Sequence, residues 1–235
     1  MRAYILAGGE GTRLRPYTYT VPKPMLRLGG KPIMRYVIEN LKRCGIRDII
    51  ITCGYRHEQI TSYFGEGNAL GVKVTYSIEK EKMNTAGSVL HCKERPRETF
   101  VVAMGDHLTN IDIGAMVKQH KKSGAIATVA LYRQNMPLEY GVATVQGNSI
   151  IGLAEKPVLE HLYNTAIYLF EPEIFNYIKE KEDFAKDVIP RLLAEKRKVD
   201  AYIFDDVWFD IGRVSDYERF REIFDISRLL TDLKG

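Results

Sequence analysis

The sequence predicts an α/β fold: a Rossmann-like, mostly parallel sheet flanked by helices, with a small antiparallel addition. Two observations predict it. Short apolar runs of strand length alternate with segments whose apolar residues repeat at helical spacing through the first half of the chain. Glycine-containing turns end several of those runs, as they do at the ligand-binding edge of parallel sheets. A single domain of 235 residues is expected, since no Pro-rich or Ser/Gly-rich linker divides the chain.

The first half of the chain is expected to build most of the parallel sheet. Lys31-Pro32 would open a helix with proline in its first turn, and Gly45 would end it. The order strand, helix, strand implies right-handed crossovers between parallel strands. Buried strands are expected at 4–7, 48–53, 72–78 and 99–104, with helices at 31–44, 56–64, from 85, and at 113–123.

The second half adds strands of a different kind. Residues 140–145 and 150–154 alternate around a Gly147-Asn148 turn, which predicts a hairpin that forms one wall of a ligand pocket. The other expected elements are strands at 125–132, 164–168 and 199–204, the last followed at once by residues 207–212, and helices from 172 and over 185–196. A final helix carries apolar residues expected to pack on the body rather than to form a dimer contact: Tyr217, Phe220, Ile223, Phe224, Leu230 and Leu233.

Composition and charge exclude several function classes. The hydrophobic share of 45% and charged share of 27% are those of a soluble globular protein, and no apolar run is long enough to span a bilayer. The net charge of +4 is mild, so neither nucleic acid nor membrane is an expected partner. Three widely spaced cysteines indicate neither disulfides nor a zinc site. The apolar run after Arg2 stops at Gly8, too short for a signal peptide, so a cytoplasmic location is expected.

A glycine-rich loop follows the first strand and is suited to phosphate. Gly8, Gly9 and Gly11 let the backbone adopt positive φ angles and approach a ligand, so that successive N–H groups can form an anion-binding nest. Thr12 adds a hydroxyl, and Arg13 adds a planar set of donors that match phosphate oxygens. On this loop alone, a sharp turn with Arg13 as a solvated cation stays an alternative.

A lysine held between two prolines follows ten residues after Arg13. Pro22 and Pro24 stiffen the backbone while the ammonium of Lys23 stays free to move, so a second cation can reach the same phosphate. The sequence has no G-x-x-x-x-G-K-[ST] and is therefore not a P-loop protein. Residues 9–11 give only G-x-G, and Leu14 stands where a dinucleotide fingerprint needs a third small residue, so a Rossmann oxidoreductase is disfavoured.

The motif LAGGEGTRLRP followed by PKPM resembles the signature of nucleotidyltransferases that join a nucleoside triphosphate to a sugar 1-phosphate, and similar motifs follow in order along almost the whole chain. The resemblance implies that residues 1–132 mainly bind the nucleotide, that 133–212 mainly bind the sugar phosphate and that 213–235 form a C-terminal helix. It implies that Arg13 and Lys23 are the catalytic cations. It also implies nucleotide contacts by Leu6, Ala7, Gly8, Gly9, Gly11 and Thr12.

A T-A-G segment at the start of the helix from residue 85 resembles the element that lies against the base in this family. Thr85, Ala86 and Gly87 are therefore expected to contact the nucleotide. Met83-Asn84 stand where the family usually has Leu-Gly, which leaves the base preference open. Thr85 as a simple helix cap is an equally supported alternative.

Two aspartates are candidates for metal binding. Asp106 follows the strand at 99–104, where it would face the same crevice as Arg13 and Lys23. Mg²⁺ prefers oxygen ligands and is commonly held by one or two carboxylates together with substrate phosphates. The resemblance implies that Asp106 and Asp210, the latter in a W-x-D-I-G element, bind this Mg²⁺. Arg213 replaces the small residue that often follows, so the entrance near the metal would be more crowded or more cationic.

The elements E-Y-G-V, E-K-P and N-x-x-x-Y resemble those that surround the sugar phosphate in the same family. Hydroxyls need acceptors or amides and a phosphate needs a cation, so the chemistry of these residues fits the assignment. The resemblance implies sugar contacts near Gly141 and by Glu155 and Asn164, and a phosphate contact by Lys156. The expected sugar-phosphate residues are Tyr140, Gly141, Glu155, Lys156 and Asn164.

The function implied is an enzyme that transfers a nucleotidyl group from a nucleoside triphosphate to a sugar 1-phosphate and releases pyrophosphate, with Mg²⁺ as cofactor. The T-A-G segment favours mannose-1-phosphate guanylyl transfer, and thymidylyl or uridylyl transfer to glucose 1-phosphate stays open. A non-catalytic sugar-nucleotide sensor is the alternative from another class. A homo-oligomer stays open, and no hexapeptide repeats that would indicate an added acyltransferase are present.

Overall fold

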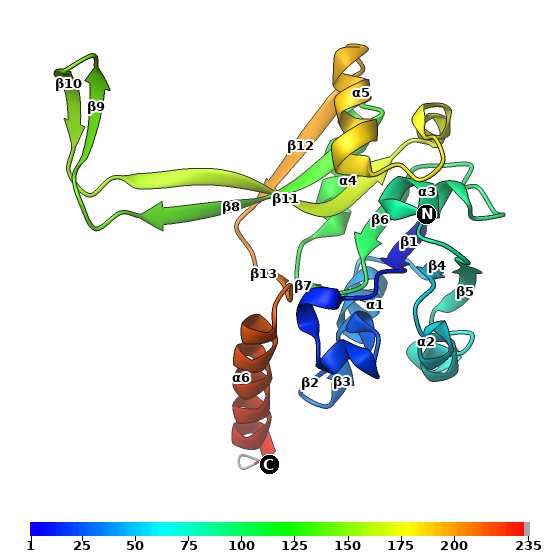
Figure 1. Ribbon diagram of the computed structural model, residues 1–235. Helices are drawn as coiled ribbons and strands as arrows, with labels where there is room; N and C mark the ends of the chain where they lie inside the picture. Colours follow the sequence, from blue (N-terminus) through cyan, green and yellow to red (C-terminus); the bar gives the residue numbers. More distant parts are fainter. Residues whose placement is uncertain (233–235) are drawn as a thin grey trace.

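The computed structural model describes the backbone of residues 1–232 and the side chains of residues 1–224. Its centre is a seven-stranded sheet in the order β12-β8-β11-β6-β1-β4-β5 (Figure 1). All of these strands run in the same direction except β11, which is antiparallel to both of its neighbours. The strands are β1 Arg2–Ala7, β4 Asp48–Cys53, β5 Lys73–Ile78, β6 Phe100–Met104, β8 Ala127–Pro137, β11 Val158–Phe170 and β12 Val199–Phe204.

Helices cover both faces of this sheet, which explains why its central strands are continuously apolar. On β1, Ala3 and Ile5 join a core with α1, α2 and α4, whereas Tyr4 and Leu6 join a second core with α3 and α5. None of the helices in residues 1–232 has the length and apolar character needed to cross a bilayer. The helices are α1 Ile33–Arg43, α2 His57–Phe64, α3 Asn84–Leu90, α4 Ile113–Ser123, α5 Ile189–Ala194 and α6 Val214–Asp232.

Two helix boundaries differ from the sequence prediction. Lys31-Pro32 forms a short strand, β3, that pairs with β2 (Arg27–Leu28), and α1 begins only at Ile33. Pro32 has ψ 145°, an extended conformation, so it precedes the helix instead of occupying its first turn. The predicted helix over 185–196 is a π-helical turn, Phe184–Val188, followed by the short α5.

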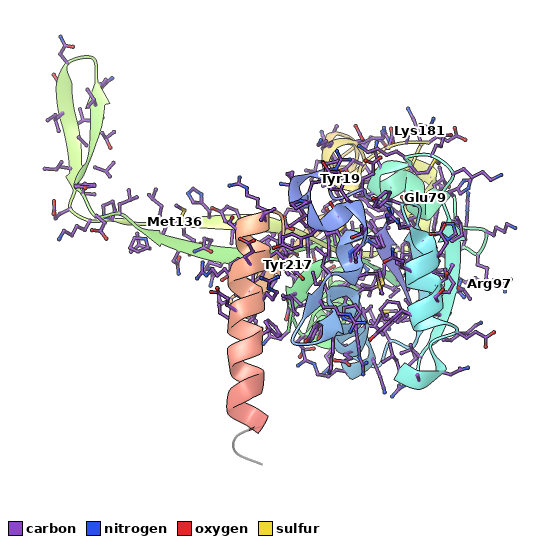
Figure 2. The ribbon with its side chains drawn as sticks, turned by 60° about the horizontal axis from the view of Figure 1, so that its bottom comes forward. Tyr19, Glu79, Arg97, Met136, Lys181 and Tyr217 are labelled. Atoms are coloured by element: carbon purple, nitrogen blue, oxygen red, sulfur yellow. The ribbon has the colours of Figure 1, made fainter. Side chains whose placement is uncertain are left out.

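A long arm, defined here as residues 134–162, extends from the body in both views (Figures 1 and 2). Its stem is the outer part of the β8–β11 ladder, and its tip is the predicted hairpin of β9 (Val142–Gln146) and β10 (Ser149–Ala154). Both stem strands are longer than predicted. The apolar signal of a buried strand ends near Tyr132, but backbone pairing continues outward to Pro137 and Val158 because it does not require burial.

The last helix packs on the body through Tyr217 and Phe224, as its apolar spacing predicts, whereas Ile223 of the same pattern is 46% exposed. Tyr217 is 6% exposed, and its ring lies edge-on to Tyr17 at 5.0 Å. Further along α6, Phe224 lies edge-on to Tyr36 at 5.6 Å. Leu230 and Leu233, which belong to the same predicted pattern, lie outside the residues whose side chains are described.

Candidate active site

The carboxyl ends of four parallel strands lie at one edge of the sheet and bring the candidate site together. In the register of the sheet Ala7 is opposite Cys53, Cys53 is opposite Ile78, and Leu6 is opposite Met104. The loops that begin at Gly8, Gly54, Glu79 and Gly105 therefore start side by side. Ligands of open α/β sheets bind at this edge.

Within the glycine loop, only Gly11 requires a left-handed backbone. Its φ is +63°, and a Cβ there would lie 3.1 Å from Cβ of Lys23. Gly8 and Gly9 do not adopt positive φ, contrary to the sequence prediction. Gly8 instead allows the Glu79 carboxylate to lie close to the loop: a Cβ on Gly8 would lie 2.6 Å from Oε2 of Glu79, and that side chain would have to shift.

Backbone amides of this loop are available for an anion. In the described part of the chain, the N–H groups of residues 9–11 donate to no protein acceptor. The carbonyl of Gly11 is used instead: it accepts from the Leu14 N–H at 2.9 Å and from Oγ1 of Thr18 at 2.8 Å. The side chain of Leu14 is 1% exposed and anchors the turn in the core. The loop therefore leaves successive N–H groups without a protein acceptor, as an anion-binding nest requires, and phosphate binding there stays a prediction.

Lys23 lies between the two predicted metal aspartates. Its Nζ is 2.5 Å from Oδ2 of Asp106 and 3.2 Å from Oδ1 of Asp210. The aspartates meet because β7 (His107–Thr109) pairs antiparallel with β13 (Trp208–Asp210), placing Asp210 opposite His107. The guanidinium of Arg13 lies beside the cluster. A Cβ built on Gly212 would lie 3.3 Å from Oδ2 of Asp210 and 3.7 Å from Nη1 of Arg13, so both side chains border the same small space.

The two buried charges of this cluster stabilise each other. Burial alone would raise the pKa of Asp106, but the charges of Lys23 and His107 outweigh it and hold that pKa below its usual range. Burial alone would lower the pKa of Lys23, but Asp106 and Asp210 raise it above its usual value. Both side chains are therefore ionised at neutral pH.

The cluster fits a metal ion that is shared with substrate phosphates. Oδ1 of Asp106 is buried and accepts no hydrogen bond among the described residues, although Nε2 of His107 lies 3.8 Å from it, so this oxygen can still accept a ligand. Among the side chains of residues 1–224 no group of three or more His, Cys, Asp or Glu is arranged to hold a metal ion by itself. Mg²⁺ does not need such a group, because it retains water and commonly takes one or two carboxylates plus phosphate oxygens.

Sequence reasoning missed Glu79 (labelled in Figure 2), whose carboxylate lies against Gly8 of the glycine loop. Its Oε1 is buried without a hydrogen-bond partner among the described residues, and burial raises the pKa of this carboxyl group. The backbone N–H of Glu79 donates to the Cys53 carbonyl at 2.8 Å, which fixes the residue at the ligand-binding edge. Its position directly after a predicted strand is the signal that could have identified it.

The T-A-G segment is used for packing against residues 181–184. The N–H groups of Ala86 and Gly87 donate to the Glu182 carbonyl at 3.0 and 3.1 Å. The hydroxyl of Thr85 donates to Asp183 at 2.9 Å, and Thr85 is inside α3 rather than at its cap. These three groups already have protein partners, and Ala86 packs in the same core cluster as Leu6 of β1, so the nucleotide contact of this segment stays a prediction.

The predicted sugar-phosphate residues are separated into two groups. Asn164 stays at the body, where it donates to the Tyr168 hydroxyl at 3.0 Å and neighbours Thr165, whose carbonyl contacts His107. Tyr140, Gly141, Glu155 and Lys156 are on the exposed arm (Figure 1). The prediction that the hairpin forms a wall of the pocket is therefore wrong for a single chain.

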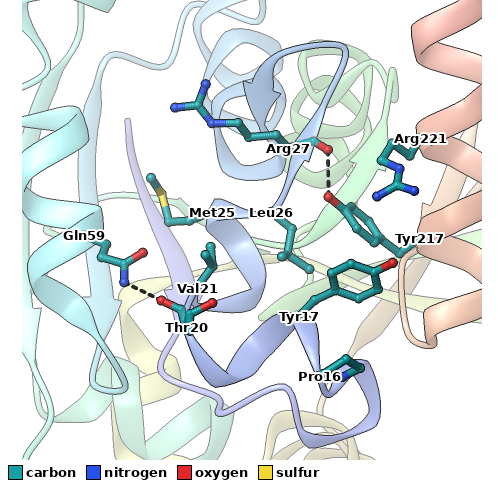
Figure 3. Close-up of a pocket in the computed structure, with 10 residues that line it drawn as sticks. All are labelled: Pro16, Tyr17, Thr20, Val21, Met25, Leu26, Arg27, Gln59, Tyr217 and Arg221. Atoms are coloured by element: carbon teal, nitrogen blue, oxygen red, sulfur yellow. Dashed lines mark hydrogen bonds between the residues drawn. The ribbon is translucent and has the colours of Figure 1, made fainter.

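An open pocket of about 630 Å³ lies behind the lysine loop (Figure 3). It is lined by residues of the segment 16–27, by Gln59 of α2, and by Tyr217 and Arg221 of α6. Gln59 donates to the Thr20 carbonyl at 2.7 Å, and Tyr217 donates to the Arg27 carbonyl at 3.0 Å. These contacts hold the loop that presents Lys23, and none of the four charged residues of the site lines the pocket.

The chain is similar in sequence to known proteins. A family model described as nucleotidyl transferase matches residues 2–224. A UTP–glucose-1-phosphate uridylyltransferase of Synechocystis is 37% identical, with 92% of this chain and 61% of the relative covered. A D-glycero-alpha-D-manno-heptose 1-phosphate guanylyltransferase of Campylobacter jejuni is 34% identical, with 94% and 98% covered. The chain thus spans about three fifths of the first relative and nearly all of the second.

Solved structures agree with the sequence relatives. A putative glucose-1-phosphate thymidylyltransferase from Bacillus anthracis, crystallised with a sucrose, is 29% identical with a TM-score of 0.76, covering 96% of this chain and 95% of that one. HddC from Yersinia pseudotuberculosis complexed with GMP-PN is 25% identical with a TM-score of 0.74, covering 95% and 99%. The resemblance of the signature loop is confirmed: the chain belongs to the nucleotidyl transferase family, and the relatives compared are sugar-1-phosphate nucleotidyltransferases.

Proposed function

We propose that this chain transfers a nucleotidyl group from a nucleoside triphosphate to a sugar 1-phosphate, giving a nucleoside diphosphate sugar and pyrophosphate. The observation that carries the proposal is Lys23 held between Asp106 and Asp210, beside Arg13 and the free amides of residues 9–11. Such an arrangement binds and neutralises phosphates at the edge where this fold binds ligands. We propose that the protein acts in the cytoplasm, where nucleoside triphosphates are available.

The reaction needs no nucleophile from the protein. An oxygen of the sugar phosphate forms a bond to the α-phosphorus of the triphosphate, while the bond from that phosphorus to the β-phosphate oxygen breaks on the opposite side. Catalysis then consists of holding two polyanions in line and neutralising the charge that moves to the leaving pyrophosphate. Arg13 and the loop amides would bind the triphosphate, and Lys23 would act on the reacting phosphates.

We propose Mg²⁺ as the cofactor, held by Asp106 and Asp210. The free, buried Oδ1 of Asp106 supports this assignment. Bound there, Mg²⁺ would withdraw charge from the phosphate oxygens. Lys23 would then be released in part from the two carboxylates and become available to substrate.

We propose guanine as the base, on the chemistry of Glu79. A carboxylate only accepts hydrogen bonds, and guanine presents two adjacent donors, N1–H and the exocyclic amino group, on one edge. Uracil and thymine present a single N3–H between two carbonyl oxygens, which a carboxylate would repel. Glu79 lies against Gly8 of the phosphate loop with Oε1 unpaired, so its free acceptor is available at the nucleotide edge.

The sugar is proposed to be a manno-configured sugar 1-phosphate. The relatives whose names specify guanylyl transfer act on mannose 1-phosphate or on the manno-heptose 1-phosphate. The uridylyltransferase relative argues for glucose 1-phosphate, and it is the competing assignment.

The experiment is a grid of GTP, dTTP, UTP, CTP and ATP against hexose, aminohexose and heptose 1-phosphates, with pyrophosphate release as the readout. Release from GTP with a manno-configured sugar phosphate, lost when Mg²⁺ is chelated, is the expected result. If no combination releases pyrophosphate but a nucleotide sugar still raises the melting temperature of the protein, the chain is a sensor of sugar nucleotides and not an enzyme.

Glu79→Gln is expected to shift the base preference. The amide still accepts from N1–H or N3–H but also donates, so it loses one guanine contact and gains one to a pyrimidine carbonyl. The ratio of kcat/KM for GTP to that for UTP should fall about 10- to 100-fold, as expected for one polar contact. Glu81→Gln is the matched control, because Glu81 is exposed and pairs with Lys181 at 2.7 Å. An unchanged ratio in Glu79→Gln would remove Glu79 from the base site.

A further inference from the structure

The arm, residues 134–162, exposes more apolar surface than a monomer would be expected to leave in water. Its most exposed large apolar side chains are 60% to 80% exposed: Tyr140, Ile150, Ile151, Leu153 and Val158. The tip is a two-stranded hairpin, and such a hairpin is only marginally stable in water without a surface to pack against. Both observations indicate that another surface covers the arm.

The arm also carries groups that the site on the body lacks. Glu155 lies against Gly141, where a Cβ would stand 2.9 Å from its Oε2, so two of the sugar-phosphate elements are already assembled on the arm. Lys156 follows directly and is exposed. On the body, Lys23 is already paired with two carboxylates, so a second polyanionic substrate would need a further cation.

The arm is built to hold these groups away from its own body. The β8–β11 ladder pairs without interruption from Tyr132 and Tyr163 out to Pro137 and Val158. Beyond it residues 138–141 and 155–157 are irregular, the Leu138 N–H donates to the Pro157 carbonyl at 3.0 Å, and the tip is a separate two-stranded sheet. Folding the arm back onto its own site would require this ladder to bend.

We infer that two copies of this chain exchange arms, so that Glu155 and Lys156 of one copy complete the phosphate site of the other. The surface that covers the arm is a second copy of this chain, because the arm carries the sugar-phosphate elements that the site on its own body lacks. An exchange in both directions about a two-fold axis closes and buries both arms. Lys156 of one copy then faces the sugar phosphate, while Arg13 and Lys23 of the other face the triphosphate. The inference rests on the proposed function.

The test is complementation between two inactive variants. Lys156→Met removes the arm cation and Asp106→Asn disables the body, and each variant alone is expected to be inactive. Co-expressed with different tags and purified as a mixed dimer, the pair contains one site with an intact body and an intact arm. That dimer should show about half the activity of wild type, because one of its two sites is complete. The control dimer, Asp106→Asn with Asp210→Asn, has both lesions in the body and should stay inactive.

A second measurement separates failure of the inference from failure of the proposed function. Leu153→Asp changes a side chain that is 72% exposed, so it should fold normally. By light scattering the wild type should be a dimer and this variant a monomer without activity. If the wild type is an active monomer, or if the mixed dimer recovers no activity, the arm exchange is wrong while the proposed enzymatic function stands. If the wild type is an inactive dimer and Leu153→Asp makes it a monomer, the interface between arms is supported and the proposed function is contradicted.

Discussion

Asp106→Asn is expected to reduce turnover on the order of 10³-fold or more while leaving the fold intact. The amide has nearly the same shape as the carboxylate, but it carries no charge to bind Mg²⁺ or to pair with Lys23, whose Nζ is 2.5 Å away. kcat/KM measured at saturating Mg²⁺, together with a thermal melt, checks this. The matched control is Asp112→Asn, on an exposed residue at the start of α4 where Asn caps a helix as well as Asp does. Near-normal Mg²⁺-dependent turnover in Asp106→Asn would remove this residue from the metal site.

Lys23→Met is expected to be inactive and to lose stability in a pH-dependent way. The change leaves Asp106, whose side chain is 14% exposed, without its nearest cation. Breaking a buried pair typically costs about 3–5 kcal/mol. We expect about 2–3 kcal/mol here, because Asp210 is 38% exposed and solvent screens part of the repulsion. Added Mg²⁺ should restore part of the loss, since it supplies the missing positive charge.

The contribution of Asp106 to stability should change with pH in opposite directions, and in different pH ranges, in the two proteins. In the wild type the folded pKa of Asp106 lies below its unfolded value of about 3.9, so its stabilisation is present above that value and is lost as the pH falls through the folded pKa. In Lys23→Met the buried carboxylate loses the charge that lowers its pKa, so protonation should stabilise the variant as the pH falls from about 8 to about 5. Urea unfolding in the presence of a chelator measures both slopes. Parallel slopes would contradict the stabilisation of Asp106 by Lys23.

Much of the fold and part of the site could be predicted from the sequence because the signals are local. The apolar run at 48–53 matches β4, and the run at 99–104 is one residue longer than β6. Both could be recognised because a strand covered on both faces must be apolar throughout. The carboxyl-edge rule then places Gly8 and Asp106 at one edge. That Asp210 joins them depends on pairing between β7 and β13, which are separated by about a hundred residues. Only the family resemblance indicated it.

The rest could not be predicted because it depends on tertiary contacts. The small residues of the T-A-G segment pack against residues 181–184, and no pattern around Thr85 names that partner. Glu79 is one of many acidic residues, and only the structure shows its carboxylate against Gly8. The hairpin at 140–154 was predicted correctly as a local element. Its direction is set by the β8–β11 ladder beneath it, whose outer part lacks the continuous apolar run of a buried strand.

The most direct test of the proposed reaction follows the oxygens of the sugar phosphate. The wild type is incubated with unlabelled GTP and a sugar 1-phosphate whose phosphate oxygens are ¹⁸O, and the products are analysed by mass spectrometry. Attack of the sugar phosphate on the α-phosphorus predicts that all of the label, including the oxygen that bridges the two phosphorus atoms, is in the nucleoside diphosphate sugar and that pyrophosphate is unlabelled. Label in pyrophosphate or in free phosphate, or the absence of a nucleoside diphosphate sugar, would contradict it.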